Sequence, residues 1–260
     1  MIEIEGAKIT PASPFIISEP GDYRVVGGIS GRFETGAAIW IQSDDVRLDG
    51  AGQGIFNERP DPDTEARAVY CNSFRTNVHV RNVHSCGFLD IVTMIGADLL
   101  IEGVTGRAWQ NLVIIEGDSG TIRHVTGTAG GTTYVPGATR GFGIQNDCVR
   151  AVSEDNVLFD CIGGNADGQF GEGVGISHGG GGATGAIRRN YIINRIKAPC
   201  SFGTWVSGLA NRVEFHDNTI VGYDVGIAAA MDSAVVARNN VLHNVNTPFS
   251  GPITDEGTTN

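Results

Sequence analysis

A short strand-like segment recurs along this chain and limits the folds that are open to it. The segments that begin at Asn77, Asp98 and Ser119 alternate apolar and polar residues, and each begins 21 residues after the one before. Further copies begin at Asn156, Gly185, Arg212 and Ala234, at less regular spacing. One such segment is too small to bury itself, so successive copies must stack on each other. The repeat therefore predicts a solenoid.

A second short strand follows the first in the repeating unit. These second strands alternate with period two and are bounded by Gly, Asn or Asp, whereas no stretch shows a sustained helical period. The chain also contains 38 glycines without a collagen period, which favours frequent tight turns. We therefore expect an all-β chain whose coils stack as parallel sheets. The second strands are Asp90–Thr93, Asn111–Ile114, Gly143–Asn146, Gly175–His178, Thr204–Ser207 and Gly226–Ala229.

Three segments near the start of the chain resemble a known family. Pro20–Tyr23 (PGDY) forms a turn signal before a strand, Ala38–Ile41 is apolar, and Val46–Gly50 (VRLDG) has the form V-x-L-D-G. This order is similar to the first coils of the pectate-lyase-like right-handed parallel β-helix superfamily, and the similarity extends over nearly the whole chain. It implies a single-stranded right-handed parallel β-helix. It implies no single activity, because this scaffold carries lyases, hydrolases, epimerases, phage tailspikes and adhesins.

We expect one domain over residues 1–260, because no stretch has the composition of a linker. Residues 1–32 are expected to form an N-terminal cap and first coil, and residues 247–260 an irregular tail. Two adjacent middle coils carry enlarged loops, at 129–140 and 163–173. Ligand sites on rigid scaffolds are commonly built from such loops, so these coils are the expected place for a site.

The charge of the chain restricts its partners. A formal net charge of -11 argues against binding to nucleic acid or to anionic membranes. The first ten residues have neither the basic nor the apolar part of a secretory signal, and no apolar run approaches the roughly 20 residues of a membrane span. We expect a soluble protein, either cytoplasmic or a processed secreted form. The scattered cysteines indicate buried thiols rather than a metal site.

Two sets of polar residues are expected to form structural ladders. Stacked coils place equivalent residues about 4.8 Å apart, so side chains at equivalent positions interact along the stack. The asparagines after strands predict a hydrogen-bonded ladder, and outward residues of alternating sign predict a charge ladder. The asparagines are Asn82, Asn190, Asn218 and Asn240, and the charged residues are Arg81, Glu102, Arg123 and Asp160.

Polar residues replace apolar ones on two neighbouring second strands. Alignment of the copies places Ile144 beside Ile176, so that Gln145 lies beside Ser177 and Asn146 beside His178. The other coils carry mostly apolar residues at these positions. Because the two enlarged loops are adjacent, we interpret the polar residues as the floor of a groove. The alternative is a polar stack that is satisfied inside the protein, with His178 as a scaffold residue.

The carboxylates near this predicted groove suggest a reaction. Glycosidases use two carboxyl groups about 5 to 9.5 Å apart, and Asp147 with Asp167 or Glu172 is the expected pair. His178 would orient one of them. The expected substrate-binding residues are Gln145, Asn146, Ser177, Tyr134, Arg140, Phe170, Trp205 and Arg188. No metal or other cofactor is expected; an alternative is calcium at the oxygen-rich segment that contains Asp167 and Glu172.

The leading functional hypothesis is a carbohydrate-active enzyme that cleaves glycosidic bonds of an oligo- or polysaccharide. Hydrolysis is placed ahead of lyase chemistry, which needs an arginine or lysine base such as Arg140 or Arg188. The rival hypothesis is a non-catalytic binding or structural module of the tailspike or surface-protein kind, for which a homo-oligomer is expected. A third hypothesis is an epimerase or cyclase that acts on a small molecule in a closed pocket.

Overall fold

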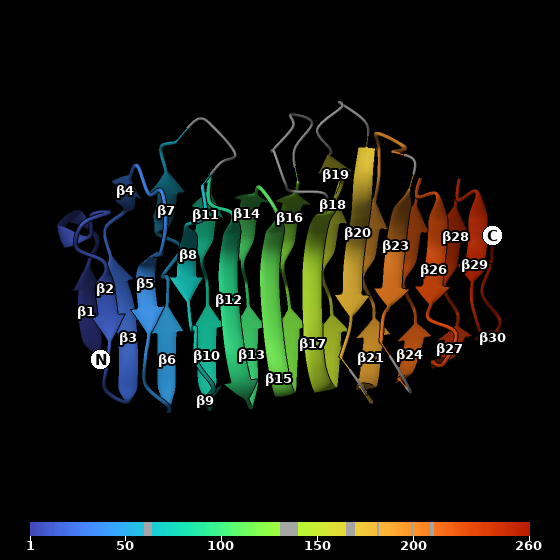
Figure 1. Ribbon diagram of the computed structural model, residues 1–260, viewed down its shortest axis with the longest axis horizontal. Coiled ribbons are helices and arrows are strands. Elements are labelled where there is room, and N and C mark those ends of the chain that lie inside the picture. Colours follow the sequence, from blue (N-terminus) through green and yellow to red (C-terminus); the bar gives the residue numbers. More distant parts are fainter. Residues whose placement is uncertain (60–63, 131–139, 165–169, 181, 199, 209–210) are drawn as a thin grey trace.

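The computed structural model is a right-handed parallel β-helix, which confirms the predicted fold (Figure 1). It describes residues 1–59, 64–130, 140–164, 170–180, 182–198, 200–208 and 211–260. The coils stack along the long axis of the molecule, and the N- and C-termini lie toward opposite ends of the stack. Equivalent strands of successive coils pair in parallel, so a residue's neighbours along the stack are its counterparts one coil away.

Each coil contributes strands to three faces. The first face contains β2 (Phe15–Ile17), β5 (Ala37–Ile41), β8 (Arg67–Tyr70), β12 (Asp90–Ala97), β20 (Phe170–His178), β23 (Ser201–Val206), β26 (Val225–Ala229) and β29 (Thr247–Ser250). The second face contains β1 (Ile2–Glu5), β3 (Gly21–Val26), β6 (Val46–Asp49), β10 (Val78–Arg81), β13 (Leu99–Glu102), β21 (Thr184–Arg188), β24 (Arg212–His216), β27 (Ala234–Arg238) and β30 (Ile253–Glu256). The third face contains β4 (Ile29–Gly31), β7 (Gly54–Asn57), β11 (His84–Cys86), β14 (Thr105–Ala108), β16 (Thr126–Ala129), β18 (Val157–Phe159), β22 (Tyr191–Ile193), β25 (Thr219–Val221) and β28 (Val241–His243).

Two long strands cross from the first face to the second. β15 (Asn111–Arg123) pairs with β12 through its first half and with β13 through its second half. β17 (Arg140–Glu154) follows β15 in register over both halves. These strands therefore bend around one edge of the solenoid in the middle coils. Shorter elements complete the chain: the 3-10 turn η1 (Gly6–Lys8), β9 (Arg75–Thr76) and β19 (Gly163–Gly164), which pairs antiparallel with β20.

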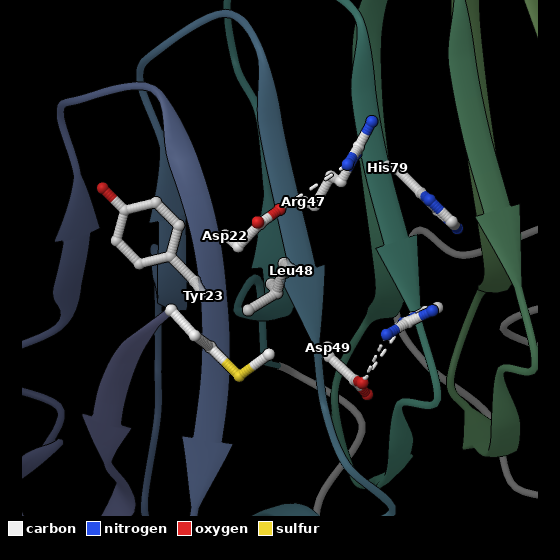
Figure 2. Close-up of a pocket in the computed structure, with 8 residues that line it drawn as sticks. Asp22, Tyr23, Arg47, Leu48, Asp49 and His79 are labelled. Carbon is white, nitrogen blue, oxygen red and sulfur yellow. Dashed lines mark hydrogen bonds and ion pairs between the residues drawn. The ribbon is translucent and has the colours of Figure 1, made fainter.

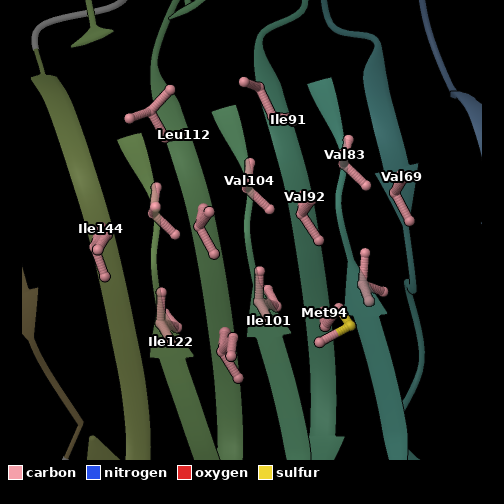
Figure 3. Close-up of a cluster of buried hydrophobic side chains, with 14 of the residues drawn as sticks. Val69, Val83, Ile91, Val92, Met94, Ile101, Val104, Leu112, Ile122 and Ile144 are labelled. Carbon is pink, nitrogen blue, oxygen red and sulfur yellow. The ribbon is translucent and has the colours of Figure 1, made fainter. Parts of the chain in front are cut away.

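The interior is a continuous stack of aliphatic side chains. Val69, Val92, Val113 and Ile144 follow one another in register on the first face, and all are fully buried (Figure 3). Side chains of the second face, such as Ile101, point toward them from the other side of the coil. Because the strand period is two, the residues on either side of a buried one point outward. This alternation decides which site residues can reach a ligand.

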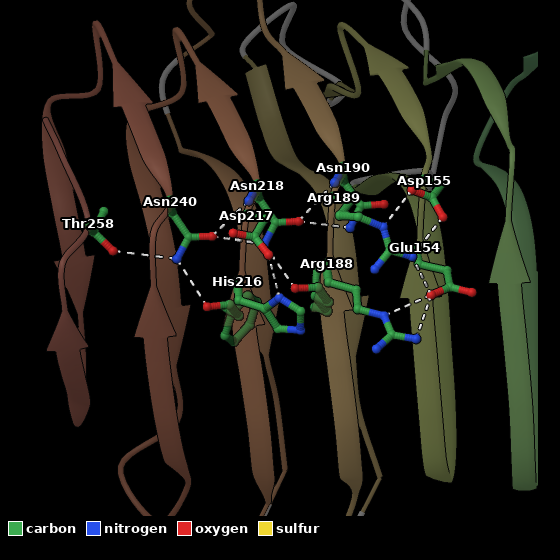
Figure 4. A network of polar contacts seen from close by, with 12 residues as sticks. Glu154, Asp155, Arg188, Arg189, Asn190, His216, Asp217, Asn218, Asn240 and Thr258 are labelled. Carbon is green, nitrogen blue, oxygen red and sulfur yellow. Dashed lines mark hydrogen bonds and ion pairs between the residues drawn. The ribbon is translucent and has the colours of Figure 1, made fainter.

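An asparagine ladder runs through the C-terminal coils (Figure 4). Asn190, Asn218 and Asn240 are buried and bonded in series, as predicted, and Asn156 extends the series by donating from Nδ2 to Asn190 Oδ1 at 2.8 Å. Asn82 is not a member, contrary to the prediction, because it is exposed and donates to Asp49. Asn82 has a left-handed φ of 52°. In the coils of the ladder the left-handed position is the one directly before the ladder asparagine, and it is occupied by Asp155, Arg189, Asp217 and Asn239.

Alternating charges follow one outward row of the second face. Arg81, Glu102 and Arg123 occupy this row as predicted, and Arg123 is ion-paired with Glu102 at 2.6 Å. The next member is Glu154, not Asp160. Asp160 lies after β18 and pairs with Arg195 instead. The ladder continues with Arg188, whose Nε donates to Glu154 at 2.7 Å. Partly exposed pairs of this kind contribute little each, and the row mainly matches neighbouring coils.

The C-terminal residues form a regular coil. Residues 247–260 were expected to be irregular, but they form β29 and β30 and add a last coil. Within that coil Thr258 accepts a hydrogen bond from the final ladder residue, Asn240. At the other end β1 pairs with β3, inside the range expected for a cap and first coil.

Two sequence expectations concern side chains and membranes. Cys71, Cys148 and Cys161 are buried free thiols as expected, whereas Cys86 and Cys200 are exposed, contrary to the expectation. In the described part of the chain, no helix is long and apolar enough to cross a membrane.

Candidate functional site

The predicted pairing of the two polar strands is confirmed, but Asn146 and His178 point into the solenoid and not outward as predicted. Ile144 pairs with Ile176, Gln145 with Ser177 and Asn146 with His178. Since Ile144 points into the core, the residue two positions later must point inward too. Asn146 is fully buried, and its Nδ2 donates to the backbone oxygens of Gly120 and Val152 at 3.2 Å each. Asn146 therefore cannot contact a substrate on the outer surface.

His178 is also inside the solenoid, which contradicts its predicted catalytic role. It is fully buried, and its Nε2 lies 2.9 Å from Ser153 Oγ on the second face. Burial lowers the pKa of His178 to about 3, because an imidazolium would lose its hydration there. The side chain is therefore neutral at pH 7 and out of contact with solvent. The alternative interpretation, a scaffold histidine within a buried polar stack, is the one that the structure supports.

Gln145 and Asp147 are partly exposed on the outward side, whereas Ser177 in the same outward row is buried, at 3% exposure. Asp147 is held by two hydrogen bonds. Its Oδ2 accepts a hydrogen bond from Gln145 Nε2 at 2.5 Å, and the backbone N–H of Gly179 also donates to the carboxylate. The carboxylate fills the space above Gly179, where a Cβ would collide with Oδ1. Partial burial raises the pKa of Asp147; the hydrogen bond from Gln145 opposes this, and the charge of Glu116 adds to it.

Glu116 is a site residue that the sequence interpretation missed. It is the Cα partner of Asp147 on the adjacent strand β15, and its side chain is exposed. Partners in adjacent strands are about 4.8 Å apart, so the two carboxylates are neighbours at the bend between the first and second faces. The signal was present in the repeat, because aligning Val113 with Ile144 places Glu116 beside Asp147.

Glu172, one of the two predicted partners of Asp147, is not its neighbour. Glu172 is the Cα partner of Arg140 at the start of β17, seven positions before Asp147, or roughly 20 Å at about 3.3 Å per residue. That separation is too large for a glycosidase pair, so the pairing of Asp147 with Glu172 was wrong. Asp167 and Tyr134 lie outside the described residues. Arg140 and Phe170 begin β17 and β20, but their side chains lie outside the described part.

An aromatic pair flanks the outward row of Gln145 and Ser177. Trp205 is the Cα partner of Ser177 on β23 and is partly exposed. Its ring stacks on Phe202 with centroids 5.5 Å apart and an interplanar angle of 25°. Arg188, in contrast, belongs to the charge ladder and lies on the second face, so its predicted place in the groove was wrong. Gln145, Ser177 and Trp205 thus form a polar and aromatic strip across three coils of the first face.

A separate hollow lies near the N-terminal end of the second face (Figure 2). It has a volume of about 210 Å³, and its walls include Asp22, Arg47, Asp49 and His79. The charged groups are paired across coils: Asp22 lies 3.9 Å from Arg47, and Asp49 binds Arg81 at 3.0 Å. These charges are already neutralised by each other, so this hollow is a poor candidate for a catalytic site. No group of three or more His, Cys, Asp or Glu side chains within the described ranges is placed to hold a metal ion.

Comparison with known proteins supports the fold. No protein family model matches the sequence, and no curated protein matches it. DFA-IIIase from Arthrobacter chlorophenolicus A6, solved in complex with DFA-III, is similar with a TM-score of 0.51 and 10% identity, over 99% of this chain and 74% of that chain. The A-module of the mannuronan C-5 epimerase AlgE6 from Azotobacter vinelandii aligns over 99% of this chain and 87% of its own, with 14% identity and a TM-score of 0.28, from which we draw no argument.

The structure and the similarity to DFA-IIIase together define the fold. The chain is a right-handed parallel β-helix. Within that architecture its distinctive feature is the pair of neighbouring carboxylates, Asp147 and Glu116, at the bend of the two longest strands.

Proposed function

We propose that this protein is a carbohydrate-active enzyme that cleaves glycosidic bonds with Asp147 and Glu116. The observation that supports this most directly is their difference in environment. Asp147 is partly buried, with its pKa raised, while its strand partner Glu116 is exposed to solvent. A partly buried carboxyl group with a raised pKa, beside an exposed carboxyl group, is suited to the acid role of glycoside hydrolysis, with its neighbour as nucleophile. DFA-IIIase, a carbohydrate-processing enzyme of similar fold, supports the substrate class.

We place a retaining mechanism ahead of an inverting one. Retaining enzymes hold their carboxyl groups about 5 to 5.5 Å apart, and the strand spacing of about 4.8 Å between paired residues allows so short a separation. Protonated Asp147 would donate its proton to the glycosidic oxygen as the bond to the anomeric carbon breaks, while Glu116 forms a bond to that carbon. Asp147 would then take a proton from water, whose oxygen displaces Glu116. Gln145 and Gly179 hold the Asp147 carboxyl in place throughout.

The lyase alternative has less support among the described residues. β-Elimination needs a base beside a uronate carboxylate and a cation to neutralise that carboxylate. Arg188, one of the predicted bases, is bonded to Glu154 on the second face. The groups beside Asp147 are instead the carboxylate of Glu116 and the amide of Gln145. Hydrolysis therefore remains ahead of elimination in our proposal.

One observation favours the rival hypothesis of an associating, non-catalytic module. On the third face Tyr191 and Val241 are exposed at 44% and 45%, in one row with Val157 and Thr219. Exposed large apolar side chains close together on a sheet are typical of a surface that contacts another protein. Sedimentation at several protein concentrations would show whether this chain forms the homo-oligomer that we expected for this hypothesis. An oligomer and a hydrolytic site are compatible, so this measurement leaves the catalytic proposal to its own test.

The catalytic proposal is tested with a panel of neutral and uronic-acid glycans. Reducing-end release reports hydrolysis, and ultraviolet absorbance of unsaturated products reports elimination. Asp147→Asn and Glu116→Gln should each reduce hydrolysis by about 10²- to 10⁴-fold, the usual contribution of a general acid or base. Glu214→Gln is the matched control, because Glu214 is an exposed strand residue on β24, remote in register from the pair. Full hydrolysis by Asp147→Asn, folded as judged by circular dichroism, would refute the assignment.

A further inference from the structure

A shallow hollow lies on the second face, three strand positions beyond the carboxylate pair. Its volume is about 520 Å³, and it extends across β13, β15, β17 and β21. Its floor contains Leu100, Thr121 and Val152, which are consecutive in register and half-buried. Its walls include Asp98, Ser119, Arg123 and Arg150. The hollow is therefore an apolar surface about three strands wide, bordered by groups that form hydrogen bonds.

The hollow and the proposed catalytic residues are parts of the same two strands. Ser119 follows Glu116 by three residues on β15, and Arg150 follows Asp147 by three residues on β17. Three residues of strand span roughly 10 Å at about 3.3 Å per residue. A chain molecule that passes the carboxylates at the bend would therefore enter the hollow directly.

The outward row that forms the floor changes in character along the stack. Toward the N-terminus it carries ionisable residues, because Arg47 and His79 precede Leu100 in register. Toward the C-terminus it carries Glu214 on β24, after Ala186. The row is thus uncharged from Leu100 to Ala186, and again at Val236 and Thr254 in the last coils. An uncharged stretch four strands wide that includes Leu100 and Val152 offers a surface to the apolar face of a sugar ring.

Arg150 is the polar group best placed to bind a ligand in the hollow. It is exposed, and no ion pair or hydrogen bond of its side chain is found among the described residues. Its register neighbours are Ser119 and Thr184, which are uncharged. Ser119 already donates to Asp98 at 2.8 Å, and Thr184 donates to Val149 O at 3.2 Å. The five N–H donors of an arginine are therefore available here to hydroxyl oxygens of a ligand.

The electrostatics of the bend select against a charged chain. Four carboxylates lie at this edge, on β15 and β17 or in the turn between β12 and β13: Asp98, Glu116, Asp118 and Asp147. Arg123 in the wall of the hollow is paired with Glu102, so Arg150 is the remaining positive charge of the described lining beside these four, in a chain whose net charge is -11. A polyuronate that entered the hollow would bring further negative charge close to this cluster and be repelled. A neutral saccharide would meet no such repulsion.

We propose that the hollow on the second face is a subsite for a neutral oligosaccharide segment on one side of the cleaved bond. Ring faces lie on Leu100, Thr121 and Val152, and Arg150 donates hydrogen bonds to ring hydroxyls. This inference rests on the proposed function, because it assigns the substrate class and one binding region of the same site. Arg150 is a binding residue in this scheme and takes no part in proton transfer.

The experiment separates binding in the hollow from catalysis at the pair. Binding of gluco-, manno-, xylo- and fructo-oligosaccharides and of hexagalacturonate is measured by calorimetry on the Asp147→Asn protein. Val152→Glu places a charged chain on the floor, and its control is Val236→Glu, a half-buried outward valine of the same row outside the hollow. Arg150→Ala is compared with Arg212→Ala, an exposed arginine two strands away in the same row that does not line the hollow.

We expect one neutral oligosaccharide to bind, Val152→Glu and Arg150→Ala to weaken that binding at least tenfold, and both controls to match the parent. In the protein with Asp147 intact, Arg150→Ala should raise KM more than it lowers kcat. Tighter binding of hexagalacturonate, binding unaffected by both hollow variants, or no binding of any neutral oligosaccharide would each overturn the inference. Failure of the catalytic proposal has a different signature, namely unchanged turnover by Asp147→Asn.

Discussion

The buried imidazole of His178 makes the stability of this protein sensitive to acid in a way that can be calculated. Burial lowers its pKa from 6.5 to about 3 in the folded state. The unfolded chain therefore takes up this proton first, and the folded state loses stability as pH falls below 6.5, down to the folded pKa. Each pKa unit corresponds to about 1.4 kcal/mol, so the loss between pH 6.5 and pH 4 is about 3 kcal/mol.

The test compares urea unfolding at pH 7, 6, 5 and 4 for the parent, for His178→Gln and for His84→Gln. His84 is exposed and serves as the control for loss of a histidine. Carboxylates whose pKa is lowered by partners, such as Glu154 beside Arg188 and Arg189, also cost stability in acid, but they do so equally in all three proteins. The difference between the parent and His178→Gln isolates the imidazole.

His178→Gln should lose about 3 kcal/mol less than the parent between pH 6.5 and pH 4, whatever its stability at pH 7. A quantity of this size is a large part of the total stability of a typical domain, so the midpoint of urea unfolding should shift visibly. His84→Gln should follow the parent. Parallel pH curves for the parent and His178→Gln would refute the reasoning that a neutral imidazole is enclosed in the solenoid.

Two other predictions concern the ladder and the proposed acid. Asn218→Ala removes four buried side-chain hydrogen bonds, to Asn190, Asn240 and Ile187 O. It should lower the free energy of unfolding, measured in urea, by about 4 kcal/mol, at about 1 kcal/mol for each bond. The exposed control Asn246→Ala should lower it by less than about 1 kcal/mol, and equal losses would contradict the ladder. Gln145→Leu removes a hydrogen bond that lowers the pKa of Asp147. The pH above which hydrolysis falls, because the acid has lost its proton, should therefore increase. If that pH is unchanged or lower in the pH–rate profile, Asp147 is not the acid.

The sequence was sufficient to predict the solenoid and its register. The pairs Ile144 with Ile176 and Asn146 with His178 could be predicted because a parallel stack aligns equivalent repeats residue by residue. Alternation by two then determines which side each residue takes. Applied from buried Ile144, it places Asn146 inside and Gln145 and Asp147 outside. The polar character of Asn146 and His178 suggests exposure, but both are buried. Backbone oxygens accept from Asn146 Nδ2 and Ser153 bonds to His178 Nε2, while Asn146 Oδ1 and His178 Nδ1 have no hydrogen-bond partner within the part of the chain that the structure describes.

Other features depended on contacts that the sequence does not state. In each coil a left-handed residue comes one position before the ladder residue. Asn82 occupies the left-handed position and Asn156 the ladder position, but an alignment of the repeats does not distinguish the two positions. The bend of β15 and β17 is also invisible in the repeat. Only that bend makes Glu116, Asp147 and the hollow beside Arg150 parts of one surface.

The pairing of β17 with a strand on either side limits where residues can be inserted during evolution. One residue inserted within the strand before Asp147 would turn that carboxylate into the interior and bring Asn146 to the surface. One residue inserted between β16 and β17 would leave both where they are, because the strand is held by β15 and β20 on either side. Length variation is therefore confined to the connections, and exchange of those connections offers a way to alter substrate preference while the carboxylate pair stays intact.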